Sequence, residues 1–160
     1  MRKQHPFEPI YNDSSHILIL GSLPSLVSVE RGFYYMHPQN RFWKILSKIY
    51  KEDAYLMSIE EKKAFVLRNH LALYDVVASC DIKNSSDASI ENVVCTDIRE
   101  ILNHTSIQKI LLNGNKAYTL FIKAYPELKD KALALPSTSS ANARMSLEEL
   151  TRVWEEALLK

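Results

Sequence analysis

The stretch His16-Ile17-Leu18-Ile19-Leu20-Gly21-Ser22-Leu23-Pro24-Ser25 joins a short apolar run to a turn of small residues. Polar residues do not alternate with the apolar ones, and such a run is typical of a β-strand that is covered on both faces. Similar runs follow at residues 71–78, 109–113 and 132–135. The sequence therefore predicts four strands of a mainly parallel sheet in the interior of an α/β protein.

Helical periodicity separates the predicted strands. Apolar residues recur at helical spacing on two faces, formed by Phe42, Ile45, Leu46 and Ile49 and by Ala117, Leu120, Phe121 and Ala124. Strands that alternate with helices form a sheet with helices on both sides, joined by right-handed crossovers. We therefore expect a three-layer α/β/α sandwich with a four-stranded central sheet.

Capping motifs mark the starts of further helices. Two Ser/Glu pairs have the spacing of a capping box, Ser58 with Glu61 and Ser146 with Glu149. These pairs predict helices that run to about Asn69 and to the C-terminus. Thr96-Asp97 is a further candidate helix start, for a helix that continues through Leu102.

Length and composition limit the possible classes of protein. The 160 residues, 46% of them hydrophobic, suit one domain that spans residues 1–160. Twenty Lys and Arg nearly balance nineteen Asp and Glu, giving a formal net charge of +1. No basic field over the whole molecule indicates a polyanionic partner, so nucleic-acid binding has to be argued from local features. The charge favours a compact monomer.

Cysteine content and the N-terminus indicate the compartment. Cys80 and Cys95 form no CxxC pair, which fits a reducing cytoplasm, argues against a zinc or iron–sulfur site and favours structural thiols. Residues 1–12 are polar and contain two prolines, without the apolar core of a signal peptide. No apolar run is long enough to span a membrane. We expect a cytoplasmic protein with no metal, no cofactor and no membrane partner.

In parallel sheets, ligands bind beyond the carboxyl ends of the strands, so the loops that follow the strands are the first place to look for a site. The first loop continues to Gly32-Phe33-Tyr34-Tyr35-Met36-His37-Pro38-Gln39-Asn40. Its aromatic rings can stack on a planar ligand, or they can cover the end of the sheet. Asn40 precedes a helix and is first interpreted as its N-cap, although its amide can also orient a water molecule. His37 is a candidate acid or base, or the donor of a structural hydrogen bond.

The loop after the last predicted strand begins Pro136-Ser137-Thr138-Ser139-Ser140 and carries four hydroxyls without a charge. Hydroxyls and backbone amides can hold phosphate oxygens, but the same residues also form ordinary turns. Asp75 is a carboxylate within an apolar strand, where it either bonds to loop amides or lines a pocket. Asn113 ends a strand and either pairs with a base edge or only terminates the strand.

Taken together, GSLPS, GFYYMHPQNRFWKIL and LPSTSSANA resemble the uracil-DNA glycosylase superfamily over roughly residues 16–143. The segment HPQNRFW is similar to that of the mismatch-specific uracil and thymine glycosylases, but Leu23 stands where those enzymes have their water-activating Asn. The match is better to the hypoxanthine-DNA glycosylases, whose motifs look like GSxPS and LPSTSPAN. Their essential Asn lies in the HPxN segment, which makes Asn40 the corresponding residue here.

This resemblance implies a monofunctional glycosylase that flips a deaminated base out of DNA and hydrolyses its N-glycosidic bond, leaving an abasic site. Hypoxanthine is the favoured base. Asn40 would position the attacking water. The implied base-binding residues are Gly21, Ser22, Leu23, Tyr35 and Asn113, and the implied DNA-binding residues are Ser25, Ser28, Pro136, Ser137, Thr138 and Ser139. His37 and Asp75 are candidate supporting residues.

Two alternatives remain open from the sequence. On the same fold, the chain could be a uracil or G·U/G·T mismatch glycosylase, which would excise uracil opposite G faster than hypoxanthine. From a different class, it could be a DNA-binding module that binds without cleaving. The Ser/His/Asp order, Walker loop and dinucleotide fingerprint of other enzyme classes are not found in the sequence.

Overall fold

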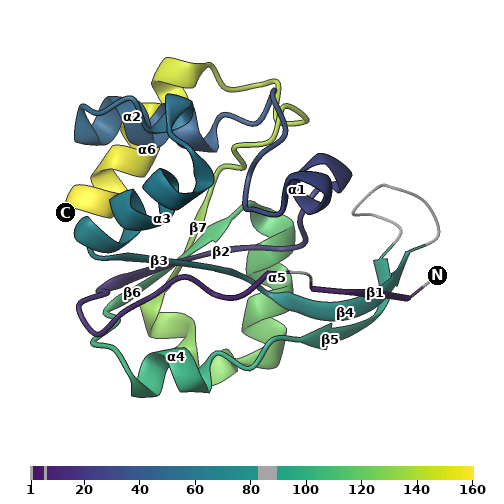
Figure 1. Cartoon of the computed structure of the whole chain (residues 1–160). Coiled ribbons are helices and arrows are strands. Elements are labelled where there is room, and N and C mark those ends of the chain that lie inside the picture. The colour runs from purple at the N-terminus through teal and green to yellow at the C-terminus, as the bar shows by residue number, and fades with distance from the viewer. Residues whose placement is uncertain (1, 6, 83–89) are drawn as a thin grey trace.

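A computed structural model describes residues 2–5, 7–82 and 90–160 of the chain (Figure 1). Its central sheet contains β2 (Ile17–Gly21), β3 (Leu71–Asp75), β6 (Lys109–Asn113) and β7 (Ala132–Leu135). The spatial order is β3-β2-β6-β7, and every neighbouring pair is parallel. The predicted four-stranded parallel sheet is confirmed.

The register of the sheet brings the ends of its strands to one edge. Gly21 is paired with Asp75, and Asn113 is paired with Leu135. Each of these residues ends its strand, so the loops that follow all leave the sheet on the same side. Helix α1 (Leu26–Arg31) lies beside this edge in Figure 1.

Helices cover both faces of the sheet, as predicted. On one face lie α2 (Phe42–Tyr50), α3 (Ile59–Arg68) and α6 (Leu147–Leu159), and on the other lie α4 (Arg99–Asn103) and α5 (Asn115–Ala124) (Figure 1). Two 3-10 turns, η1 (Ala54–Leu56) and η3 (Pro126–Lys131), connect helices and strands.

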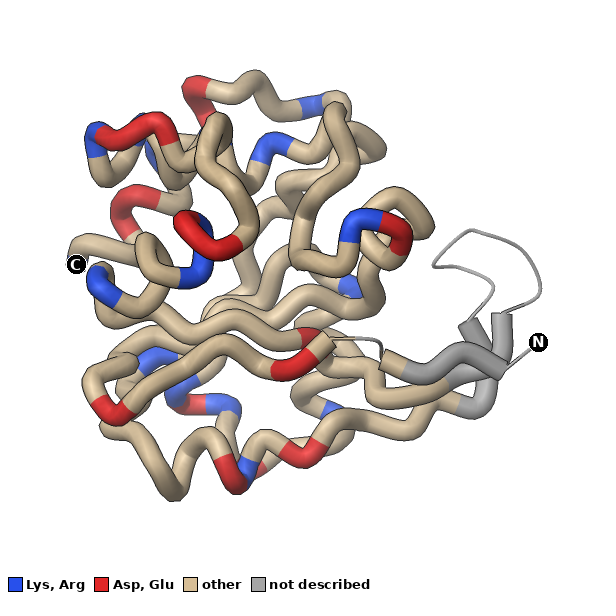
Figure 2. The backbone as a smooth tube through the Cα atoms, in the orientation of Figure 1, with Lys and Arg blue, Asp and Glu red and all other residues tan. Residues whose placement is uncertain are grey.

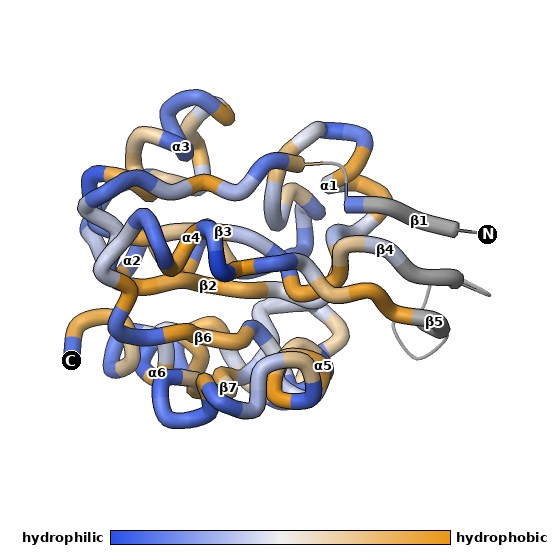
Figure 3. The backbone as a smooth tube through the Cα atoms, turned by 90° about the horizontal axis from the view of Figure 1, so that it is seen from below, coloured by the Kyte–Doolittle hydropathy of each residue, from blue (hydrophilic) through white to orange (hydrophobic). Residues whose placement is uncertain are grey.

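The alternation of side chains along β2 divides the core into two parts. Ile19 packs with the buried residues of α2, α3 and α6, whereas Leu18 and Leu20 pack with those of α4 and α5. All three side chains are completely buried, which explains why this strand carries no polar residue. Figure 3 shows β2 and much of β6 as apolar segments between more polar layers.

The predicted strand at residues 71–78 is wrong in one respect, because it is two strands. β3 ends at Asp75, and β4 (Val77–Ile82) enters a second sheet with β1 (Arg2–Gln4) and β5 (Ile90–Cys95), in the antiparallel order β1-β4-β5. The chain leaves the central sheet where Val76 and Val77 donate to the carbonyls of Gly21 and Ser22, at 2.7 and 3.1 Å. A continuous apolar run does not reveal such a bend.

The helix expected from Thr96-Asp97 begins later, at Arg99. Thr96 is buried, and its hydroxyl donates to the carbonyl of Asp75 at 2.8 Å. Asp97 accepts the backbone N–H of Arg99 at 3.0 Å. The hydroxyl of Thr96 therefore joins the start of this segment to the end of β3, and only Asp97 supports the first turn.

Both predicted capping boxes are present. Ser58 and Ser146 accept the backbone N–H groups of Glu61 and Glu149, and each Glu side chain accepts the backbone N–H of its serine. These hydrogen bonds lower the pKa of Glu149, first through the backbone of Ser146 and then through its hydroxyl.

Charges of both signs are interspersed along the chain in Figure 2, in keeping with the net charge of +1. Among the described residues, no helix has both the length and the apolar composition needed to cross a lipid bilayer. Cys95 has a free, half-buried thiol, and burial raises its pKa. The side chain of Cys80 lies outside the described part of the structure.

The capping box of α6 provides a test of the fold. We expect Ser146→Ala to lower the free energy of unfolding by about 1 kcal/mol at neutral pH, because an N–H group at the start of the helix loses its acceptor. The difference from the parent should shrink as the pH falls through the lowered pKa of Glu149, where the protonated carboxyl no longer supports the box. Urea unfolding measures both effects. An equal loss in the exposed Ser106→Ala control would contradict the assignment.

Candidate active site

Three loops meet at the carboxyl edge of the central sheet: residues 21–25, residues 32–41 and residues 136–145. The second and third are joined by a backbone hydrogen bond of 3.0 Å, from the N–H of Arg41 to the carbonyl of Thr138. Gly114, just after β6, donates to the carbonyl of Leu135 at 2.9 Å. With φ of 101°, Gly114 also lets Ser137 pack closely against its Cα.

The hydroxyl of Thr138 connects two of the candidate site residues. It donates to Oδ1 of Asn40 at 2.8 Å and accepts from Nδ2 of Asn113 at 3.0 Å. The backbone N–H of Thr138 donates to Oδ1 of Asn113, also at 3.0 Å. Thr138 is completely buried, so these bonds are shielded from water. They fix both amides relative to the sheet.

Asn40 is oriented further by the helix that follows it. Its Oδ1 accepts the backbone N–H of Phe42 at 2.9 Å, although the N-cap position itself is occupied by Arg41, which makes no side-chain cap. The predicted capping interaction is therefore present, displaced by one residue. Because Oδ1 holds two donors, the orientation of the amide is set, and within the described chain its Nδ2 has no acceptor.

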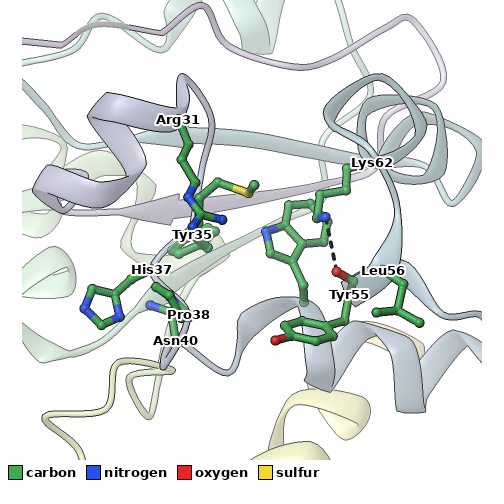
Figure 4. A pocket seen from close by; sticks show the side chains of 10 residues that line it. Arg31, Tyr35, His37, Pro38, Asn40, Tyr55, Leu56 and Lys62 are labelled. Atoms are coloured by element: carbon green, nitrogen blue, oxygen red, sulfur yellow. Dashed lines mark hydrogen bonds between the residues drawn. The ribbon is translucent and has the colours of Figure 1, made fainter.

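Asn40 lies in the wall of a pocket of about 360 Å³ (Figure 4). The wall comes from the end of α1, the loop before α2, α2 itself, η1 and α3. Its residues are Arg31, Tyr35, Met36, His37, Pro38, Asn40, Trp43, Tyr55, Leu56 and Lys62. No Asp or Glu is among them, so the pocket is aromatic and cationic and is suited to an anionic, planar ligand.

Lys62 is held within this wall. Its ammonium donates to the carbonyl of Met57 at 2.6 Å and lies 5.5 Å from the ring centroid of Trp43. Desolvation by burial lowers the pKa of Lys62. Because the ammonium is already bonded to the backbone, Lys62 stabilises the turn at η1 and contributes positive charge to the pocket from behind its surface.

Tyr35 connects the pocket with the edge of the sheet. Its backbone is in the left-handed region, with φ of 57°, and one face of its ring stacks on Phe42 with the centroids 4.1 Å apart. Its hydroxyl is buried and has no hydrogen bond of good geometry within the described residues. Burial and then the Asp75 carboxylate raise the pKa of Tyr35, with Asn113 acting in the opposite direction, so the hydroxyl stays protonated.

Gly21 shows how tightly this edge is packed. A methyl group at residue 21 would lie 2.6 Å from Oδ1 of Asp75 and 2.9 Å from the hydroxyl of Tyr35. Glycine is therefore required by the close approach of these two side chains. The phenol of Tyr35 occupies the space in front of Gly21. Of the predicted base-binding residues, Tyr35 lines the pocket, whereas Gly21, Ser22, Leu23 and Asn113 do not.

Asp75 is bonded to a residue that the sequence did not single out. Nε2 of His5 lies 2.7 Å from Oδ2 of Asp75, and the two side chains are each 4% exposed. The rings of Phe7, Tyr34 and Tyr74 surround the imidazole at centroid distances of 5.0 to 6.0 Å. The only signal in the sequence was a histidine in a polar leader that otherwise has no motif.

Arg41 is a second residue that sequence analysis missed. Its guanidinium donates to four backbone carbonyls of the loop at residues 138–145: those of Thr138 at 3.4 Å, Met145 at 2.6 Å, and Ser139 and Asn142, both at 2.8 Å. A planar guanidinium can reach several acceptors at once. Arg41 therefore shapes the loop that was expected to contact DNA.

Two of the predicted DNA-binding residues are corrected by their burial. Ser28 is 1% exposed, and its hydroxyl accepts from the N–H of Met36 at 2.9 Å and from the hydroxyl of Ser25 at 3.2 Å. Thr138 is completely buried within the bonds described above. Neither hydroxyl can reach a phosphate, and both instead fix loop conformation. Ser25 is exposed, and Pro136, Ser137 and Ser139 are half-buried, so these four stay candidates for DNA contact.

His37 is half-buried in the pocket wall, and its Nδ1 accepts the backbone N–H of Gln39 at 3.1 Å. This bond stabilises the turn before Asn40 and leaves Nε2 as the ring nitrogen that a ligand can reach. Within the described residues, no three His, Cys, Asp or Glu side chains gather in a way that could hold a metal ion.

Comparison with known proteins identifies the family of this site. Residues 8–158 match the family model of the uracil DNA glycosylase superfamily. A hypoxanthine DNA glycosylase of Methanosarcina barkeri is 32% identical, over 97% of this chain and 98% of that protein. One of Methanosarcina acetivorans is 30% identical, over 88% and 89%. A solution NMR structure from M. acetivorans, provisionally described as a uracil DNA glycosylase, has a TM-score of 0.82 at 28% identity and covers 99% of this chain and 97% of its own.

The four bonds of Arg41 provide a test of how the site is held. We expect Arg41→Lys to lower the free energy of unfolding by about 1 to 3 kcal/mol, because one ammonium cannot satisfy four buried carbonyls. Amide hydrogen exchange should become faster in residues 138–145. Arg152→Lys on the exposed side of α6 serves as the control. Unchanged exchange in the loop of the Arg41 variant would show that other contacts hold it.

Proposed function

The chain belongs to the uracil DNA glycosylase superfamily and is a DNA glycosylase, and we propose that its substrate base is hypoxanthine in DNA. The product would be an abasic site. The observation that carries the proposal is the fixed amide of Asn40 in the wall of an aromatic, cationic pocket. The names of the two relatives at 30 to 32% identity support hypoxanthine as the base.

Excision requires the damaged nucleotide to leave the duplex. Extrusion costs a few kcal/mol, and less for a wobble-paired base such as hypoxanthine. The pocket offers Tyr35 as an aromatic wall, with Arg31 and the buried Lys62 as positive charge. Ser25, Pro136, Ser137 and Ser139 are proposed to contact the DNA backbone around the extruded nucleotide.

Hydrolysis of the glycosidic bond develops positive charge on the sugar and negative charge on the base. We assign Asn40 to the water that attacks C1′. An amide cannot remove a proton at neutral pH, so it acts by orientation and proximity. Its Oδ1 is already occupied by Thr138 and Phe42, and the amide nitrogen is the group left to contact the water or the sugar. Backbone amides of Ser22 and Leu23 are proposed to stabilise the departing base.

A monofunctional mechanism follows from the kind of residues in the pocket wall. A lyase reaction through a Schiff base needs an amine that is free to attack the sugar. Lys62 is the lysine of this wall, and it is 3% exposed and bonded to the carbonyl of Met57. Attack by water is therefore the proposed route, and the sugar ring is released intact.

Asn40 can be tested with a matched control. In Asn40→Ala, the buried hydroxyl of Thr138 and the N–H of Phe42 lose their acceptor, so we expect a stability loss of about 1 to 3 kcal/mol together with loss of most excision. Thr138→Val removes the same contact but keeps the amide. We therefore expect it to lose similar stability and to retain far more activity. Single-turnover excision and thermal melting measure the two effects. Equal loss of excision in both variants would make Asn40 only a structural cap.

A substrate panel tests the proposed base and the alternatives. Duplexes that contain deoxyinosine, deoxyuridine, deoxyxanthosine or a G·T mismatch are incubated with the protein and examined for alkali-labile sites. We expect the fastest cleavage with deoxyinosine. Faster cleavage of uracil opposite G would identify a mismatch glycosylase, and binding of the duplexes without release of any base would identify a non-catalytic module.

A further inference from the structure

The buried pair of His5 and Asp75 has no part in the hydrolysis described above. Two ionisable side chains, each 4% exposed, are costly to bury, and they lie at the edge of the sheet where the site is formed. Burial of such a pair beside a pocket is an indication of function. Three carboxyl-edge groups converge here, because Oδ1 of Asp75 and the hydroxyl of Tyr35 both approach Gly21.

The two atoms that face Gly21 differ in hydrogen-bonding character. Asp75 binds His5 through Oδ2, so its Oδ1 is the oxygen that offers an acceptor beside Gly21. The hydroxyl of Tyr35 is buried without a hydrogen-bond partner among the described residues, and it is a donor whose partner is missing. An unsatisfied buried donor costs about 1 to 3 kcal/mol, so a ligand that supplies its acceptor gains that energy on binding.

An acceptor next to a donor is complementary to an N–H next to a C=O. Deamination creates this lactam edge on a base: it turns the N1 acceptor and C6 amine of adenine into the N1–H and C6=O of hypoxanthine. Deamination of cytosine to uracil makes the same change at N3 and C4. The parent bases present the reverse order, an acceptor ring nitrogen beside a donor amine, which would place a lone pair against the carboxylate.

We propose that His5, Asp75 and Tyr35 read the lactam edge of the extruded base, with Asp75 accepting its N–H and Tyr35 donating to its carbonyl. His5 is a positioning residue that holds Asp75 and offsets its negative charge. The inference rests on the proposed function and names the substrate class of that same site: lactam bases. Tyr35 forms both the pocket wall and this edge, so a base arrives from the pocket and shifts the Tyr35 ring as it binds.

The edge separates deaminated bases from their parents but does not by itself reject guanine or thymine, which carry the same lactam group. Those bases sit in standard pairs, and their extrusion costs more than that of a wobble-paired base. The groups that face the carboxylate from neighbouring elements are His5 from the N-terminal segment, Tyr34 and Tyr35 from the loop before α2, and Tyr74 from β3. Each is a potential donor, so the buried carboxylate is stabilised on several sides.

The test compares two bases that differ only at the lactam nitrogen: hypoxanthine and its 1-deaza analogue, which has C–H in place of N1–H. Both are placed in duplexes on 2′-fluorinated sugars, which resist glycosidic cleavage, and their affinities are measured. We expect the wild-type protein to prefer hypoxanthine by about tenfold. In Asp75→Asn and His5→Leu, the preference should fall to near unity, because the acceptor is lost or misplaced.

Conservative variants separate this role from a purely structural one. His5→Gln keeps a donor for Asp75 and should restore most of the preference, whereas Tyr35→Phe should weaken binding of both bases about equally, because both keep the carbonyl. The exposed His104→Leu serves as the control and should keep the full preference. Thermal melting identifies folded variants. A preference that persists undiminished in folded Asp75→Asn and His5→Leu would overturn the proposal.

Binding and excision fail independently in this design. If the wild-type protein prefers hypoxanthine over its 1-deaza analogue through Asp75 but does not release hypoxanthine from the unmodified nucleotide, the proposed excision activity is wrong and edge reading stands. If it excises hypoxanthine but binds the two analogues equally, edge reading is wrong and the proposed function stands.

Discussion

The hydroxyl of Thr138 is the contact on which the arrangement of the site depends. It joins the amide of Asn113, at the end of a central strand, to the amide of Asn40, which begins the helix on one face. Because Thr138 is completely buried, no water can replace either bond, and both amides are held at fixed orientation. The rigid edge of a parallel sheet thereby positions a catalytic candidate that lies on a loop.

The central sheet and its covering helices could be predicted because each depends on local patterns. Unalternating apolar runs occur only where both faces are covered, and the two capping boxes mark helix starts directly. The small antiparallel sheet was missed because residues 71–78 read as one apolar run, although the chain turns at Val76. That turn depends on hydrogen bonds to residues 21 and 22, and such long-range bonds leave no periodic signal in the sequence.

The candidate site was predicted in part for the same reason. Asn40 and Tyr35 were found because their loop carries a recognisable motif, and both line the pocket. His5 and Arg41 were missed, because one acts across 70 positions and the other through backbone carbonyls of a distant loop. Ser28 was misassigned, since residue type alone does not tell an exposed hydroxyl from a buried one.

The grip of Arg41 on the loop at residues 138–145 has a mechanical consequence. Arg41 is the next residue after Asn40, so any displacement of that loop is transmitted through one peptide unit to the amide. A duplex that seats the loop correctly also sets the amide, and one that seats it poorly pulls the amide out of line. Recognition of the backbone and readiness for hydrolysis are then one event, and accuracy arises from mechanical coupling as well as from the shape of the pocket.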